Sequence, residues 1–136
     1  MATQLDHIIL PVNDRAKAID FYTRILGLKH EGEREPFSVI RVTPEFQIQL
    51  APWGTKGGEH LAFAMSRAEF DAVFGRIVEN GIEYGDKFDT VGNMQGPGDE
   101  TAESIRSAGG GARGPGKALY FFDPSRHLIE IRHYEV

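Results

Sequence analysis

The sequence predicts an α+β protein that consists of two repeated βαβββ modules. Each half of the chain opens with a short apolar stretch that contains one histidine, His7 or His60. Each half continues with an amphipathic helical stretch that ends at a glycine, Gly27 or Gly81. The two glycines are separated by almost the same interval as the two histidines, so the same plan occurs twice.

The first module begins with a buried strand over residues 5–11. Asn13 or Asp14 then caps a helix, because a short polar side chain accepts a hydrogen bond from a free N–H group of the first turn. Gly27 ends this helix, since glycine readily adopts the left-handed conformation there. The helix carries apolar side chains at helical spacing, at Ala18, Ile19, Tyr22, Ile25 and Leu26. Three short strands follow, over residues 28–33, 37–43 and 46–51.

The second module repeats these elements after residue 57. His60 lies on a strand, and Ser66 and Glu69 have the spacing of a capping box at the start of a helix. The apolar stripe of this helix consists of Phe70, Val73, Phe74 and Ile77. Strands near residues 82–85, 117–123 and 127–134 complete the module. We therefore expect a single domain, residues 1–136, with module one at 1–57 and module two at 58–136.

Residues 86–116 form an insertion in the second module. This stretch is rich in glycine, proline and charged residues and has little to bury, so we expect a flexible loop with one helical turn near residues 100–106. A long loop beside a concave site is a candidate lid. The alternative, which we weigh equally, is an insertion without a role at the site.

Alternation along the last strand of each module predicts which side chains face away from the helices. In module two, Ile129 and Ile131 face the helix and Glu130 faces the other side. In module one, Gln49 occupies the place of Glu130. A pseudo-twofold between the modules would bring these positions and the two histidines to one concave face.

His7, His60 and Glu130 are therefore candidate metal ligands. Two imidazoles and one carboxylate form a facial triad that leaves coordination positions open on a divalent metal. The chain has no cysteine, so any metal must be held by nitrogen and oxygen. The alternatives are core histidines, and for Glu130 an arginine partner such as Arg132 or Arg41.

Further residues are candidates for catalysis or substrate binding. Tyr120 should face the cavity and orient or protonate a substrate oxygen, or pack as an ordinary aromatic. Gln49 would hydrogen-bond a metal-bound water, or serve as a polar strand residue. Arg113 would anchor an anionic substrate, or remain solvated. Phe37 and Trp53 would line an apolar pocket, although core packing explains them equally well.

The composition excludes several classes of function. The formal net charge of −5 offers no basic face for nucleic acid. The chain has no apolar run long enough to span a membrane and no visible signal peptide, so we expect a cytoplasmic protein.

Four segments together resemble the vicinal oxygen chelate superfamily, which includes glyoxalase I, bleomycin-resistance proteins, fosfomycin-resistance enzymes and extradiol dioxygenases. They are Leu5-Asp-His-Ile-Ile-Leu-Pro-Val, Ala18-Ile-Asp-Phe-Tyr-Thr-Arg-Ile-Leu-Gly-Leu, Glu59-His-Leu-Ala-Phe and Tyr120-Phe-Phe-Asp-Pro-Ser-Arg-His-Leu-Ile-Glu-Ile. The resemblance implies paired βαβββ modules whose eight strands form a half-open barrel around a metal. It assigns the ligand roles to His7, His60 and Glu130, and it implies a homodimer.

Departures from the family pattern reduce the number of subgroups whose function the chain could share. Gln49 stands where glyoxalase I has a fourth ligand, a glutamate, and Ala118 stands where fosfomycin-resistance enzymes have a serine. Bleomycin-binding members lack the triad. The glycine-rich approach to the last hairpin is similar to small oxygenases that tailor aromatic polyketides.

The function expected from the resemblance is that of a metal-dependent, dioxygenase-type enzyme acting on a hydrophobic or aromatic small molecule. Fe(II) is the favoured metal, with Mn, Ni or Zn as alternatives. A lyase or isomerase of glyoxalase type is the second enzyme hypothesis. A protein of another class, which sequesters a drug without turnover and without metal, is the remaining alternative.

Overall fold

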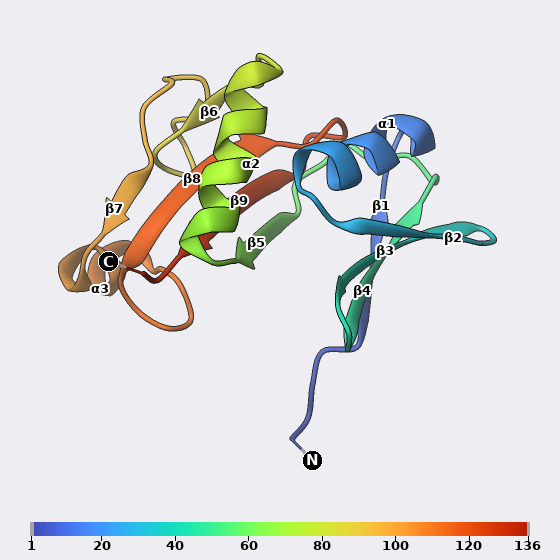
Figure 1. The fold of residues 1–136 in the computed structure, drawn as a ribbon, viewed down its shortest axis with the longest axis horizontal. Coiled ribbons are helices and arrows are strands. Elements are labelled where there is room, and N and C mark those ends of the chain that lie inside the picture. The colour runs from blue at the N-terminus through green and yellow to red at the C-terminus, as the bar shows by residue number, and fades with distance from the viewer. Residues whose placement is uncertain (1, 136) are drawn as a thin grey trace. The chain divides into compact units, whose positions relative to one another are not determined.

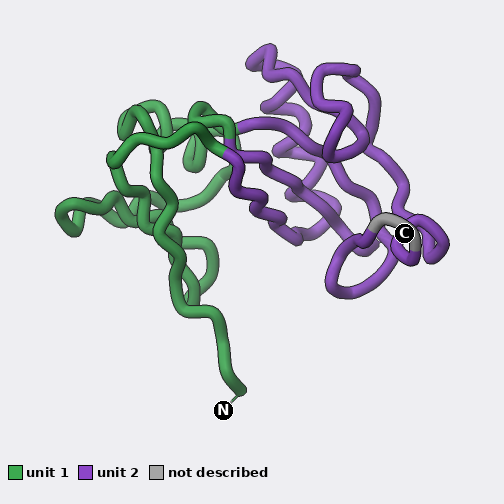
Figure 2. Tube along the Cα trace, turned by 180° about the vertical axis from the view of Figure 1, so that it is seen from behind, with its two compact units in different colours: residues 1–57, 123–126 green, residues 58–122, 127–136 purple. Residues whose placement is uncertain are grey.

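The computed structural model describes residues 2–135, apart from the side chains of Ser107 and Ala108. The chain divides into two compact units (Figure 2). Unit 1 comprises residues 1–57 and 123–126, and unit 2 comprises residues 58–122 and 127–136. The boundary after Gly57 coincides with the predicted boundary between the modules.

Unit 1 contains one four-stranded sheet and one helical segment (Figure 1). Its strands lie in the order β1-β4-β3-β2. The elements are β1 (His7–Pro11), α1 (Arg15–Asp20), η1 (Phe21–Ile25), β2 (Lys29–Arg34), β3 (Phe37–Thr43) and β4 (Phe46–Ala51). The predicted strands are confirmed to within two residues at each end.

The helical segment of unit 1 begins as predicted and then widens. The carboxylate of Asp14 accepts a hydrogen bond from the backbone N–H of Lys17 and so caps α1. The next turn, η1, is a π-helix, in which Leu26 donates to the carbonyl of Phe21 five residues earlier. The wider turn brings Phe21 and Tyr22 into the core together, whereas the 3.6-residue pattern predicted only Tyr22.

Residues 123–126 belong to unit 1 through two hydrogen bonds. The buried hydroxyl of Tyr22 donates to Asp123 Oδ2 at 2.7 Å, and the backbone N–H of Asn13 donates to Ser125 Oγ at 3.0 Å. Burial and the neighbouring Asp123 carboxylate raise the pKa of Tyr22 well above its ordinary value. Tyr22 therefore stays protonated and remains a donor to Asp123.

Unit 2 repeats the plan with a larger sheet. Its strands lie in the order β5-β9-β8-β6, and β7 also pairs with β8. The elements are β5 (His60–Ala64), α2 (Arg67–Glu79), β6 (Tyr84–Gly85), β7 (Gly98–Glu100), α3 (Ala102–Ala108), β8 (Gly116–Phe122) and β9 (Leu128–His133). Ser66 caps α2 by accepting from the N–H of Glu69, as predicted. No helix within residues 2–135 is long and apolar enough to cross a membrane.

The closing strand of each unit pairs in parallel with its opening strand. In unit 1, His7 lies opposite Gln47 and Ile9 opposite Gln49. In unit 2, His60 lies opposite Leu128 and Ala62 opposite Glu130. Gln49 and Glu130 therefore occupy equivalent places relative to the two histidines, as the sequence repeat predicted. The two open sheets confirm the α+β class with paired βαβββ modules.

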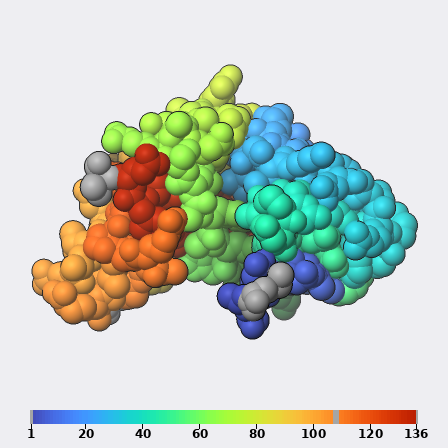
Figure 3. All heavy atoms as spheres, turned by 60° about the horizontal axis from the view of Figure 1, so that its bottom comes forward, coloured from blue at the N-terminus to red at the C-terminus, as the bar shows by residue number. Residues whose placement is uncertain are grey.

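The insertion has more secondary structure than expected. Instead of one helical turn, it contains the strand β7 and the helix α3, which begins with a capping box between Thr101 and Ser104. The prediction missed β7 because Gly98, Asp99 and Glu100 have low strand propensity. Their pairing with β8 comes from the free edge of that strand. In the space-filling view, the insertion (orange) lies beside the C-terminal strand (red) of the same unit (Figure 3).

Substitution Tyr22→Phe should lower the free energy of unfolding by about 1.5–3 kcal/mol, because it leaves the buried carboxylate of Asp123 without one of its donors. Tyr84→Phe is the matched control, since the Tyr84 hydroxyl has no hydrogen-bond partner among the described residues. It should change stability by less than about 0.5 kcal/mol. Urea unfolding measures both, and equal losses in the two variants would contradict the anchoring role of Tyr22.

Candidate functional site

The face of unit 2 that points away from α2 carries two of the three predicted metal ligands. His60 is the first residue of β5, and Glu130 lies in the neighbouring strand β9. His60 Nε2 and Glu130 Oε1 are 3.0 Å apart. The Glu130 side chain is 7% exposed and the His60 side chain is 47% exposed, so a buried carboxylate faces an accessible imidazole.

The buried side chains of β9 follow the predicted alternation. Ile129 and Ile131 are fully buried on the helix side. His133 also lies on that side, where its ring packs edge to face against the ring of Phe70, with the ring centroids 4.9 Å apart. His127 is buried and accepts a hydrogen bond from the backbone N–H of Glu59. Both histidines are therefore packed within the fold.

Glu130 also has the arginine partner that the sequence suggested as an alternative. Arg132 Nη1 donates to Glu130 Oε2, and the same guanidinium donates to both carboxylate oxygens of Glu100, at 2.7 and 3.0 Å. Burial lowers the pKa of Arg132, but its hydrogen bonds to Glu100 and Glu130 outweigh burial and raise it. Arg132 is therefore a permanent cation between two carboxylates. The other suggested partner, Arg41, pairs with Glu31.

Tyr120 lies on the same face of the sheet as Glu130, as strand alternation predicted, but it lines a neighbouring pocket and not the one that contains His60. It is the direct cross-strand neighbour of Glu130, and its ring centroid is 6.2 Å from that of His60. Burial, followed by the charges of Glu130 and Glu100, raises the pKa of Tyr120 well above its ordinary value. Tyr120 is consequently a protonated donor beside the carboxylate.

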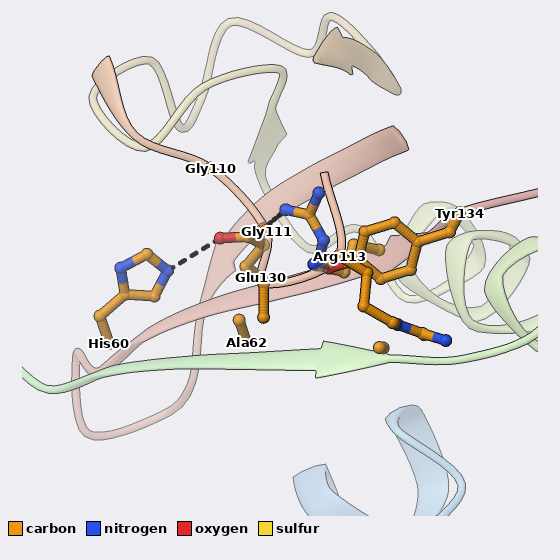
Figure 4. A pocket seen from close by; sticks show the side chains of 10 residues that line it. His60, Ala62, Gly110, Gly111, Arg113, Glu130 and Tyr134 are labelled. Atoms are coloured by element: carbon orange, nitrogen blue, oxygen red, sulfur yellow. Dashed lines mark hydrogen bonds and ion pairs between the residues drawn. The ribbon is translucent and has the colours of Figure 1, made fainter. Parts of the chain in front are cut away.

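A cavity of about 370 Å³ opens beside these residues in unit 2 (Figure 4). Strand β5 contributes the three alternate residues of one face, His60, Ala62 and Ala64. Glu130, Arg132 and Tyr134 line it from β9 and the residue that follows this strand. The remaining wall is the segment of residues 110–113, which we call the strap.

The strap is packed tightly against β9. The backbone N–H of Gly111 donates to Glu100 Oε2 at 3.3 Å. A Cβ atom at Gly111 would overlap the guanidinium of Arg132 and the hydroxyl of Tyr134, so any other residue here would displace one of these groups. Arg113 lies over the ring of Tyr134 at 4.3 Å. The structure thus places Arg113 in the wall of the cavity that also contains His60 and Glu130.

The sequence analysis missed Tyr134 and Gly111, which line the cavity, and Glu100, which pairs with Arg132 in the cavity wall. Tyr134 continues the alternation of Glu130 and Arg132, so extending the strand pattern would have found it. Glu100 and Gly111 lie in the insertion, where no periodic pattern marks them. Only the contacts of the folded insertion bring Gly111 into the cavity wall and Glu100 against Arg132.

Unit 1 holds the other predicted site residues. His7 Nδ1 is 2.7 Å from Asp6 Oδ2, and Gln49 donates to Gln47 Oε1 at 3.3 Å. Phe37 and Trp53 pack edge to face, with ring centroids 5.7 Å apart. Trp53 is 60% exposed, so this pair is an accessible apolar surface of unit 1.

The donor set suits a divalent metal of the first transition series. Imidazole nitrogen and carboxylate oxygen are ligands for Fe, Mn, Ni and Zn. Glu130 has one oxygen directed at His60 while Arg132 holds the other, an arrangement that orients a ligating carboxylate. Asp6 in the same way fixes the His7 ring through Nδ1 and leaves Nε2 available. Among residues 2–135, neither unit by itself gathers three such groups.

Comparison with known proteins identifies the family. The model of the glyoxalase/bleomycin resistance protein/dioxygenase superfamily matches residues 4–131. The chain belongs to this superfamily. The predicted resemblance is therefore confirmed, and it extends over the insertion as well as over both modules.

Several solved structures share the fold. Oxidase ChaP-H1 is 27% identical with a TM-score of 0.76, over 98% of both chains. Oxidase ChaP-H2 is 26% identical with a TM-score of 0.75, over 99% of this chain and 96% of that one. A glyoxalase/dioxygenase from Nostoc punctiforme is 23% identical with a TM-score of 0.68, over 98% of this chain and 92% of that one.

Substitution Glu100→Gln should lower the free energy of unfolding by about 2–3 kcal/mol, because a neutral amide cannot serve both guanidinium nitrogens of the buried Arg132. The adjacent Asp99, whose side chain is 71% exposed, pairs with Lys117. Asp99→Asn should therefore cost less than about 1 kcal/mol. Thermal or urea unfolding measures both variants. A loss of stability in Glu100→Gln no larger than in Asp99→Asn would contradict the stabilising role of the pair between Glu100 and Arg132.

Proposed function

We propose that this superfamily member is a metal-dependent enzyme whose divalent metal is held by His7, His60 and Glu130. The observation that carries the proposal is the pair of His60 and Glu130 at the cavity, with one carboxylate oxygen directed at the imidazole. His7 has the equivalent place in unit 1 by strand register. The substrate is a small molecule that presents two neighbouring oxygens.

Incorporation of oxygen is the reaction that we favour, with Fe(II) as the metal. Two relatives above 25% identity, ChaP-H1 and ChaP-H2, are named oxidases, and the proposed three-ligand set leaves coordination positions for substrate and dioxygen. A bound divalent metal supplies Lewis-acid chemistry, and Fe(II) adds the capacity to reduce dioxygen.

The protein's own groups have separate tasks in this proposal. Arg132 holds Glu130 in its orientation. Tyr120, which is protonated at neutral pH, donates a hydrogen bond to a substrate oxygen or gives it a proton. Gln49 hydrogen-bonds an oxygen on the unit 1 side, and Phe37 and Trp53 contribute an apolar surface for the substrate.

Lyase or isomerase chemistry of glyoxalase type is the second enzyme reading, with Mn, Ni or Zn. It is disfavoured because Gln49 replaces a fourth carboxylate ligand. A drug-sequestering protein would use the same cavity without a metal. It would bind its drug undiminished after metal removal and after Glu130→Ala, whereas the proposed enzyme would lose its metal.

A homodimer in the cytoplasm completes the proposal. Strands β1 and β5 are the outer strands of their sheets, and an unpaired strand edge is commonly covered by a partner.

Metal content tests the ligand set. Protein purified without chelator or affinity tag should contain close to one Fe, Mn, Ni or Zn per chain. The variants His7→Ala, His60→Ala and Glu130→Gln should each lose most of it, because each removes one ligand. His30→Ala is the matched control, since His30 pairs with Glu33 on the surface of unit 1, and it should keep the metal.

Elemental analysis gives the stoichiometry directly. If the parent protein contains no metal after anaerobic reconstitution with Fe(II), Mn(II), Ni(II) and Zn(II), the proposal of a metal-dependent enzyme is rejected. The drug-sequestering protein is then the favoured alternative. Retention of metal in His60→Ala would reject the assigned ligands.

A further inference from the structure

The cavity of unit 2 has a second polar end, opposite to His60. Strands β5 and β9 run parallel, with His60 opposite Leu128 and Ala64 opposite Arg132. Tyr134 follows β9, and Arg113 lies over its ring. Figure 4 shows His60 and Arg113 at the two ends, with Ala62 and Glu130 between them.

Two walls of the cavity carry only small side chains. Ala62 and Ala64 form the β5 wall, and Gly110, Gly111 and Ala112 form the strap. Between the two ends, these walls therefore present backbone and methyl groups, which suit a flat apolar body. The distance along β5 from His60 to Ala64 is roughly 13 Å, which is longer than a single aromatic ring.

The two arginines of the cavity differ in whether their charge is free to bind a ligand. Arg132 is paired with Glu100 and Glu130 and is 3% exposed. The guanidinium of Arg113, in contrast, has no carboxylate partner among the described residues, and it is exposed. Its backbone N–H donates to Tyr134 Oη at 3.3 Å, which ties this part of the strap to β9. Arg113 is the cavity cation that is available to a ligand.

We propose that Arg113 and Tyr134 form an anion subsite, and that the substrate is a planar aromatic carboxylate of about two fused rings. The ring system lies between β5 and the strap, and the carboxylate accepts paired hydrogen bonds from the Arg113 guanidinium. Tyr134 holds that guanidinium by a cation–π contact. Two vicinal oxygens at the other end face His60 and Glu130, an orientation that rests on the proposed function.

The test compares two probes in protein freed of metal by a chelator. One probe is a dihydroxynaphthoate with its carboxylate on the ring opposite to two vicinal hydroxyls, and the other is the dihydroxynaphthalene that lacks the carboxylate. Calorimetric titration should show that the carboxylate strengthens binding by about tenfold or more. Arg113→Gln should abolish this difference while leaving the affinity for the neutral probe within about twofold. Arg113→Lys should restore part of it.

Arg106→Gln is the matched control, because Arg106 is an exposed arginine of α3 that does not line the cavity. It should preserve the preference for the carboxylate. Equal affinities for the two probes, failure of the dihydroxynaphthoate to bind, or the same loss in Arg106→Gln would overturn the subsite. Because the titration needs no metal, carboxylate preference in a protein that never binds metal would refute the proposed function alone. A metal-binding protein without this preference would refute the subsite alone.

Discussion

The parallel pairing of the first and last strands of each unit is the constraint on which the candidate site depends. It places Gln49 and Glu130 at the same distance along the sheet from His7 and His60, respectively. The intervening strands are antiparallel and simply return the chain to the correct edge. A slip of one residue between β5 and β9 would move Glu130 to the helix side and Ile129 or Ile131 into the cavity. The buried isoleucines therefore fix the register that presents the carboxylate.

The insertion supplies the residues that support the cavity of unit 2 from behind Arg132. Burial of the Glu130 carboxylate would be costly without a counter-charge. Arg132 provides this charge, and Glu100 from β7 binds the same guanidinium while it also accepts a hydrogen bond from the N–H of Gly111. One carboxylate of the insertion thus holds the arginine and the strap together. Arg113 has no carboxylate partner among the described residues, so the charge of Arg132 is neutralised by its neighbours and that of Arg113 is not.

The sequence predicted the regular elements well because each carried a local signal. Periodicity located α2 and the alternating faces of β4 and β9, and side-chain caps located the starts of both main helices. The insertion carried no such signal, since the short pairing of β7 is decided by β8. From the sequence, Glu130 was predicted to bind either a metal or an arginine such as Arg132. Strand alternation places Arg132 beside Glu130, but only the folded contacts reveal that Glu100 completes the pair.

Anomalous X-ray scattering from crystals of the protein reconstituted anaerobically with Fe(II) would test the central claim most directly. The account predicts a single strong peak per chain at the iron edge, bonded to His60 Nε2, His7 Nε2 and Glu130 Oε1, with Arg132 still on Glu130 Oε2. Data without a peak at these residues, or with the ion bound by other side chains while His60 and Glu130 remain paired with each other, would contradict it.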